Sequence, residues 1–105
     1  MPTEIRHILF TDDDATTALR AYCQSFGRRF PDNPIFSLTG GKQPFVTISS
    51  PADGDDEEKN LTFASEDLLS SLLLFCRKKK IPLPAHGEKI ITTLHRRLTL
   101  VIKVR

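Results

Sequence analysis

The sequence predicts a single α+β domain, residues 1–105, built from two successive βαββ units. Three observations carry this prediction. The chain is similar to itself at an offset of 53 residues, each half holds one amphipathic helical pattern, and alternating apolar residues mark short strands around each helix. We therefore expect pseudo-twofold symmetry and a six-stranded sheet, mostly antiparallel or mixed, with both helices packed on one face.

The internal repeat needs no gap. After the shift of 53 positions, residues 9–31 align with residues 62–84, and the identical pairs in this stretch are Phe10 with Phe63, Asp14 with Asp67, Leu19 with Leu72, Cys23 with Cys76 and Pro31 with Pro84. The period is half a domain, so a duplication is expected and not a solenoid. The alternative is convergence of two strand–helix units that obey the same capping rules. The repeat divides the chain into halves 1–52 and 58–105, joined by an acidic linker, 53–58.

The first half opens with a strand over Ile5–Phe10, in which Ile8 and Phe10 are expected to face inward. A helix follows, with Asp12 as the expected N-cap, because its carboxylate can accept from free backbone N–H groups of the first turn. Gly27 suits the left-handed position after the helix. The apolar stripe of this helix consists of Ala15, Leu19, Tyr22 and Phe26.

A hairpin completes the first half. Its strands are expected over Ile35–Thr39 and Phe45–Ser49, and Gly40–Gly41 allows the positive φ of a tight turn. The linker that follows is rich in proline, glycine and acids, which predicts a surface loop.

The second half repeats this order. A strand over Lys59–Phe63 leads to a helix with Ser65 as the expected N-cap, and Pro82 forbids the helix from continuing. Its apolar stripe consists of Leu68, Leu72 and Phe75. A second hairpin is expected from Glu88–Leu94, through a turn at His95–Arg96, into a strand whose apolar residues are Leu98, Leu100, Ile102 and Val104.

The stretch "LFCRKKKIPLP" raises the question of a phosphate-binding site. Arg77–Lys80 are expected in the last turn of the second helix, where the helix dipole favours bases, and this explanation is sufficient. The alternative is weak, non-specific nucleic-acid binding, because the chain from Arg77 onward has nine bases and one acid, a net charge of +8. No aromatic residue follows Phe75, so base stacking has no support there. The candidate patch is Arg77, Lys78, Lys79, Lys80, Lys89, Arg96, Arg97 and Lys103.

Catalysis and metal binding have little support in the sequence. The histidines have no partner at helical spacing and there is no Cys-x-x-Cys pair, so no metal and no cofactor are expected. A small enzyme that uses His86 or Cys76 is a second alternative. His86 has no visible partner, and Cys76 lies on an apolar helix face. We therefore expect a protein that is not an enzyme.

Protein interaction is the function that the sequence favours. If both helices cover one face of the sheet, residues out of phase with the core line the other face, which would be more apolar than solvent requires. Self-association as a homodimer is the simplest expectation, with another protein partner as the variant. The candidate residues are Leu9, Val46, Ile48, Ile91 and Val101.

Composition sets the remaining expectations. The N-terminus lacks the pattern of a signal peptide, and the longest apolar run, Leu72–Cys76, is far below the roughly 20 residues of a membrane span. Two cysteines are too few for a disulfide framework, so a reducing, cytoplasmic location is expected. No motif is specific enough to assign the chain to a known family.

Overall fold

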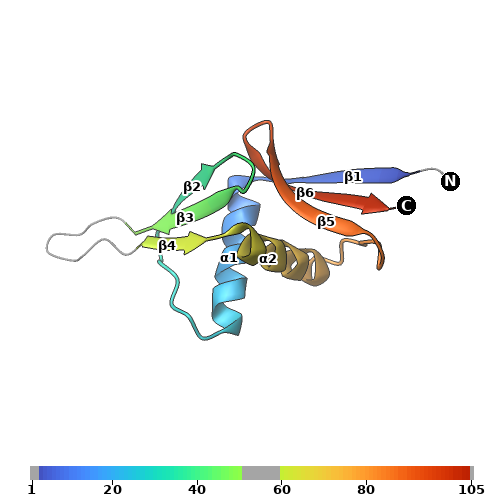
Figure 1. Cartoon of the computed structure of the whole chain (residues 1–105). Helices are drawn as coiled ribbons and strands as arrows, with labels where there is room; N and C mark the ends of the chain where they lie inside the picture. The colour runs from blue at the N-terminus through green and yellow to red at the C-terminus, as the bar shows by residue number, and fades with distance from the viewer. Residues whose placement is uncertain (1–2, 51–59, 105) are drawn as a thin grey trace, which may run out of the picture.

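The computed structural model of this protein describes residues 3–50 and 60–104 (Figure 1). Every predicted helix and strand is present, with small shifts at the ends. The elements are β1 Glu4–Phe10, α1 Asp12–Ser25, β2 Ile35–Thr39, β3 Phe45–Ser49, β4 Asn60–Phe63, α2 Ser65–Lys78, β5 Glu88–Leu94 and β6 Arg97–Val104. The predicted acidic linker, 53–58, lies outside the described residues.

The described strands form two separate three-stranded antiparallel sheets, which corrects the expected six-stranded sheet. Sheet A has the order β1-β6-β5 and sheet B the order β2-β3-β4. Each hairpin keeps its own two strands together, and its second strand pairs with the first strand of the other half. The central strands β3 and β6 are thereby paired on both sides, and each sheet is complete with three strands.

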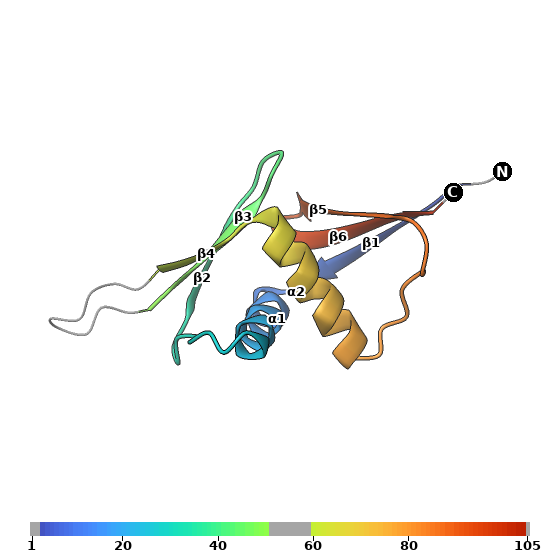
Figure 2. The same ribbon diagram turned by 60° about the horizontal axis from the view of Figure 1, so that its bottom comes forward.

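The two helices lie side by side, and the two sheets diverge above them (Figure 2). Each sheet turns one face toward the helix pair, which we call its inner face, and one face away from it, the outer face. One core joins the inner faces and both helices. Its fully buried members include Phe10, Leu19, Val46, Ile48, Phe63, Leu68, Leu72, Leu98, Leu100 and Ile102.

The N-caps of both helices differ from the predicted ones by one residue. Thr11 caps α1, accepting from the Asp14 backbone N–H at 3.0 Å, while the Asp14 carboxylate accepts from the Thr11 N–H. This capping box uses the hydroxyl of Thr11 in preference to the carboxylate of Asp12. Ala64 occupies the N-cap of α2, so that end has no side-chain cap. Ser65 instead donates its hydroxyl hydrogen to the Pro44 carbonyl at 2.7 Å.

The C-terminal ends of the helices have the same backbone geometry. Gly27 and Lys80, each two residues past the helix, both lie in the left-handed region, with φ of +68° and +57°. The next N–H closes the same turn in each case, Arg28 to the Cys23 carbonyl and Ile81 to the Cys76 carbonyl, both at 2.8 Å. Glycine, as expected, occupies this position after α1.

The predicted basic last turn is shorter than expected. Helix α2 ends at Lys78, Lys79 is its C-cap, and Lys80 already lies beyond it. Arg77 and Lys78 are therefore the bases in the last turn, where they complement the helix dipole. The last turn of α1 holds no base, because Arg28 and Arg29 follow its end.

A hydrogen bond connects the two helices through polar side chains. The Tyr22 hydroxyl donates to the Asp67 carboxylate at 3.2 Å. Burial, this hydrogen bond and the negative charge of Asp67 together raise the pKa of the Tyr22 hydroxyl. A raised pKa in the folded state stabilises the protein below the pKa of the unfolded chain and loses that contribution as pH rises through the folded value.

We expect Tyr22→Phe to lower the free energy of unfolding at pH 7 by about 1 kcal/mol, since it removes one partly exposed hydrogen bond to a charged acceptor. Above pH ~10 the difference between the two proteins should shrink, because ionisation of Tyr22 weakens the wild type alone. Urea unfolding at neutral and alkaline pH measures both values. A difference that grows with pH would contradict this assignment.

Candidate interaction surfaces

The outer face of sheet A carries an apolar surface. The strand register sets three rows of outward-facing residues across β1, β6 and β5, with the middle row formed by His7, Val101 and Ile90. Ile5 and Leu9 flank His7 along β1. The exposed fractions are 54% for Ile5, 37% for Leu9 and 47% for Ile90, so no described segment covers the two edge strands here. We call Ile5, Leu9, Ile90 and Val101 the sheet A patch.

Polar residues occupy the remaining positions of the three rows, and the register continues the face beyond them with Arg97 and Leu94. The row beside Ile5 continues with Lys103 and Glu88, and the row beside Leu9 continues with Thr99 and Thr92. Thr99 is fully buried between its neighbours and donates its hydroxyl hydrogen to the Arg97 carbonyl at 3.1 Å. Ile5 and Leu9 therefore lie at the β1 end of the two rows that are otherwise polar, and Val101 and Ile90 lie in the middle row.

The outer face of sheet B is more polar and serves as an internal comparison. Its exposed apolar side chains are Ile35 on β2 and Phe45 on β3. The other outward positions are occupied by serine, threonine and asparagine, namely Ser37, Thr39, Thr47, Ser49, Asn60 and Thr62. The two sheets share an equivalent strand order, although their hairpins differ in length, so the apolar character of sheet A is not required by the strand order.

The predicted interaction residues do not all lie on one surface. Leu9 and Val101 belong to the outer face of sheet A by the strand register, where Leu9 is 37% exposed and Val101, on the central strand, is buried at 8%. Val46 and Ile48 are fully buried in the core, and Ile91 packs against that core. These three residues correct the prediction, because β3 and β5 turn the opposite side chains outward. The sequence-based choice missed Ile5 and Ile90.

The predicted basic patch is spread over several surfaces. Arg77–Lys80 lie at the end of α2, while Arg96 and Arg97 lie at the β5–β6 turn. Lys89 pairs with Ile102 and faces the inner side of sheet A, whereas Lys103 faces the outer side beside Glu88. The bases of the β5–β6 hairpin therefore lie on both faces of sheet A and at the turn of the hairpin, and they do not form one patch.

His86 and Cys76, the residues considered for catalysis, lie apart from each other in different surroundings. Exposed His86 lines an open hollow of about 460 Å³ beside Gly87, Glu88 and Lys103. Cys76 is fully buried, as is Cys23. Burial raises the pKa of both thiols, and at Cys23 the positive charge of Arg28 opposes this effect. The raised pKa favours the unreactive neutral thiol.

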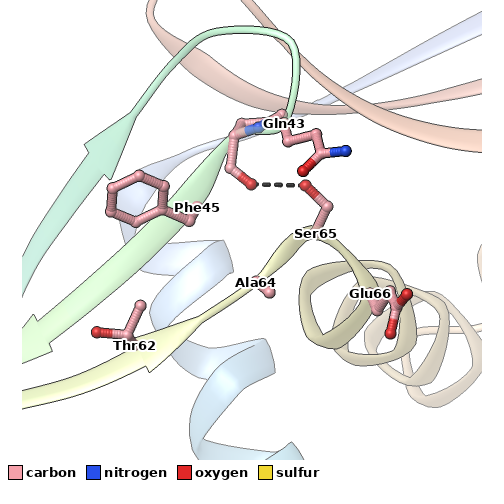
Figure 3. Close-up of a pocket in the computed structure, with 7 residues that line it drawn as sticks. Gln43, Phe45, Thr62, Ala64, Ser65 and Glu66 are labelled. Atoms are coloured by element: carbon pink, nitrogen blue, oxygen red, sulfur yellow. Dashed lines mark hydrogen bonds between the residues drawn. The ribbon is translucent and has the colours of Figure 1, made fainter.

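Another hollow, of about 470 Å³, opens between the start of α2 and the edge of sheet B (Figure 3). Phe45 and Thr62 line it from the strands, and Ala64, Ser65 and Glu66 line it from the helix. The Ser65 hydroxyl is occupied by its hydrogen bond to the Pro44 carbonyl. Glu66 places a negative charge at this helix end, where the helix dipole already favours it. The structural roles of Ser65 and Glu66 therefore explain why these residues line the hollow, and no bound ligand is needed to explain them.

Within residues 3–50 and 60–104, no three His, Cys, Asp or Glu side chains gather in a way that could hold a metal ion. No helix in the described part of the chain is long and apolar enough to cross a membrane.

Comparison with family models, with curated proteins and with solved structures finds no match to this chain.

Proposed function

We propose that this protein is a small cytoplasmic interaction domain without catalytic activity, and that it associates with a second copy of itself through the sheet A patch. The observation that carries the proposal is the exposure of Ile5, Leu9 and Ile90 on the two edge strands of one sheet face. Exposed apolar side chains gathered on one face are typical of partner surfaces. The polar outer face of sheet B shows that the fold itself does not require them.

A second copy is the partner that the residue pattern fits. We place a twofold axis across the strands, through the row of His7, Val101 and Ile90. Val101 then faces Val101 of the partner, Ile90 faces Ile90, and Ile5 faces Leu9. Lys103 and Glu88 meet Thr99 and Thr92, and His7 meets His7 of the second copy on the axis. The face is thus complementary to itself, as a twofold interface requires.

The area of the outer face of sheet A sets the expected affinity of the dimer. Three strands about 4.8 Å apart and seven residues long cover roughly 340 Å² of projected area. Stable interfaces bury about 800 Å² on each partner. We therefore expect a weak dimer, with a dissociation constant of about 0.1–1 mM.

Sedimentation equilibrium at about 0.05–1 mM protein tests the proposal. We expect the wild type to associate over this range, and we expect Ile90→Lys to weaken association at least tenfold, because a dimer would bury its ammonium group. Ile35→Lys is the matched control, since Ile35 is 53% exposed on the edge strand of sheet B. It should leave association unchanged. A monomeric wild type, or equal effects of both variants, would overturn the proposal.

We also infer that the two halves arose by internal duplication. Both helices have 14 residues, and their first and last residues are 53 positions apart. The backbone hydrogen bonds donated by the two residues after each C-cap also correspond. If the halves are exchanged, β1 takes the place of β4, β5 that of β2 and β6 that of β3. The strand order β1-β6-β5 of sheet A then becomes β4-β3-β2, which is the order of sheet B. Convergence on common capping rules would explain the helix ends but not the matching exchange of strands.

Nucleic-acid binding through the basic C-terminal third is not our preferred function. A backbone-tracking surface needs its bases along one continuous path. Lys89 and Lys103 lie on opposite faces of sheet A, and Arg96 and Arg97 lie at the turn of the same hairpin. This arrangement favours solvation and helix capping for these bases.

A further inference from the structure

Two adjoining hollows lie beside the end of α1, on a surface that includes no residue of sheet A. One has a volume of about 350 Å³ and the other about 610 Å³. They share Arg28, Phe30, Pro31 and Asp32. Arg20 and Gln24 extend the first from α1, while Arg29, Ser50 and Leu61 extend the second toward sheet B. We call this combined site the Phe30 pocket.

Three arginines define the charge of the Phe30 pocket. Arg20, Arg28 and Arg29 have no carboxylate within ion-pair distance among the described residues, where Arg6 and Glu4 form the one ion pair. The negative groups nearby are the Asp32 carboxylate, the end of α1, whose dipole is equivalent to about half an elementary charge, and the Asp67 carboxylate, which lines a neighbouring hollow together with Arg28. With these three groups subtracted from the three arginines the balance is about +0.5, so the pocket still favours an anion.

Aromatic rings orient two of these guanidinium groups. The Arg20 guanidinium lies 5.3 Å from the centre of the Phe30 ring, and that of Arg28 lies 5.9 Å from the centre of the Phe63 ring. When the flat face of a guanidinium group stacks on an aromatic ring, the N–H donors at its edge stay free. These donors have the geometry that binds phosphate. Phe30, Pro31 and Leu61 supply an apolar wall beside the donors.

The second half of the chain shows that the fold does not need these arginines. At the offset of 53 residues, Leu73 corresponds to Arg20 and Ile81 to Arg28, and both pack against the core. The backbone at Arg28 and Ile81 makes the same hydrogen bond at the same distance. Apolar residues therefore suit these places, and the arginines of the first half call for another explanation.

We propose that the Phe30 pocket binds a phosphate monoester attached to a flat, partly apolar group, as in a nucleoside monophosphate. A phosphate monoester carries about −1.5 to −2 charges at pH 7, opposite in sign to the charge of the pocket. Its oxygens would accept from the arginine N–H groups, and the base would lie against Phe30 and Leu61. Both volumes fall within the roughly 300–1,000 Å³ of small-molecule sites.

Calorimetric titration with adenosine monophosphate at low salt tests this proposal. We expect a dissociation constant of about 0.1 mM for the wild type and at least tenfold weaker binding for adenosine and for inorganic phosphate, each of which lacks half of the ligand. A 5′-phosphorylated dinucleotide distinguishes the sources of this chemistry. Tighter binding of the dinucleotide points to a nucleic-acid end, and tighter binding of the mononucleotide points to a free nucleotide.

Two variants replace an arginine of the pocket by the residue found at the corresponding position of the second half, which is Leu73 for Arg20 and Ile81 for Arg28. Arg20→Leu and Arg28→Ile should each weaken binding at least tenfold while the protein stays folded by circular dichroism. Arg77→Gln removes the same charge from α2 and should change binding less than twofold. An equal loss with Arg77→Gln, no binding by the wild type below about 5 mM, or equal affinity for adenosine would overturn the proposal. Arg29→Ser, in an exposed loop, gives the same test if another variant unfolds.

Discussion

Leu72→Ala should lower the free energy of unfolding by about 2–5 kcal/mol. Leu72 is fully buried on α2 at the centre of the core, so removing most of its side chain leaves a cavity and loses the free energy of transfer from water. Leu19→Ala should fall in the same range, because Leu19 occupies the corresponding place on α1 with equal burial. Urea unfolding measures both values.

Ile35→Ala is the control for this pair. Ile35 is an exposed aliphatic residue on an edge strand, so its truncation should cost about 1 kcal/mol or less. A cost below about 1 kcal/mol for either leucine would contradict a single core shared by both helices. A large difference between the two leucines would contradict their equivalence in the two halves.

Gly87→Ala should also be strongly destabilising, by about 2–5 kcal/mol. Gly87 has a φ of +122°, which strains any residue with a side chain, and a Cβ atom there would lie 2.8 Å from the backbone oxygen of Lys103. That oxygen belongs to β6 and cannot move without disturbing its pairing with β1 and β5. Both strain and overlap therefore act at this position.

Gly41→Ala distinguishes backbone strain from steric overlap as the cause of destabilisation. Gly41 has nearly the same φ, +124°, but a Cβ atom there would meet no atom within 4 Å. We expect it to cost about 1–3 kcal/mol from strain alone, and Gly87→Ala to cost at least 1 kcal/mol more. Thermal unfolding of the two variants provides the comparison. Equal costs would show that the start of β5 does not approach β6 as closely as described.

The local elements could be predicted from the sequence because their signals are local. Alternating apolar residues, acids at helix starts and glycine at Gly27 identify both helices and both hairpins to within a few residues. The strand pairing could not be predicted in the same way, because β1 pairs with β6 from the far end of the chain. Nothing in the sequence of a strand says which half will supply its partner.

The interaction surface was only partly predictable for a related reason. Ile90 and Ile91 are adjacent, as are Val101 and Ile102, so alternation does not say which residue of each pair faces inward. The register of β5 against β6 decides this, and it places Ile90 outward. The Phe30 pocket was missed because Arg20, Arg28 and Arg29 are brought together only by the turn after α1.

An NMR dilution series of the uniformly labelled wild type tests self-association through the sheet A patch most directly. We expect the amide signals of Ile5, Leu9, Ile90 and Val101 to shift with concentration up to about 1 mM, while those of Ile35 and Phe45 on sheet B stay fixed. The shifts should follow a single monomer–dimer curve and disappear in Ile90→Lys. Shifts confined to sheet B, or signals that do not depend on concentration, would contradict the proposed interface.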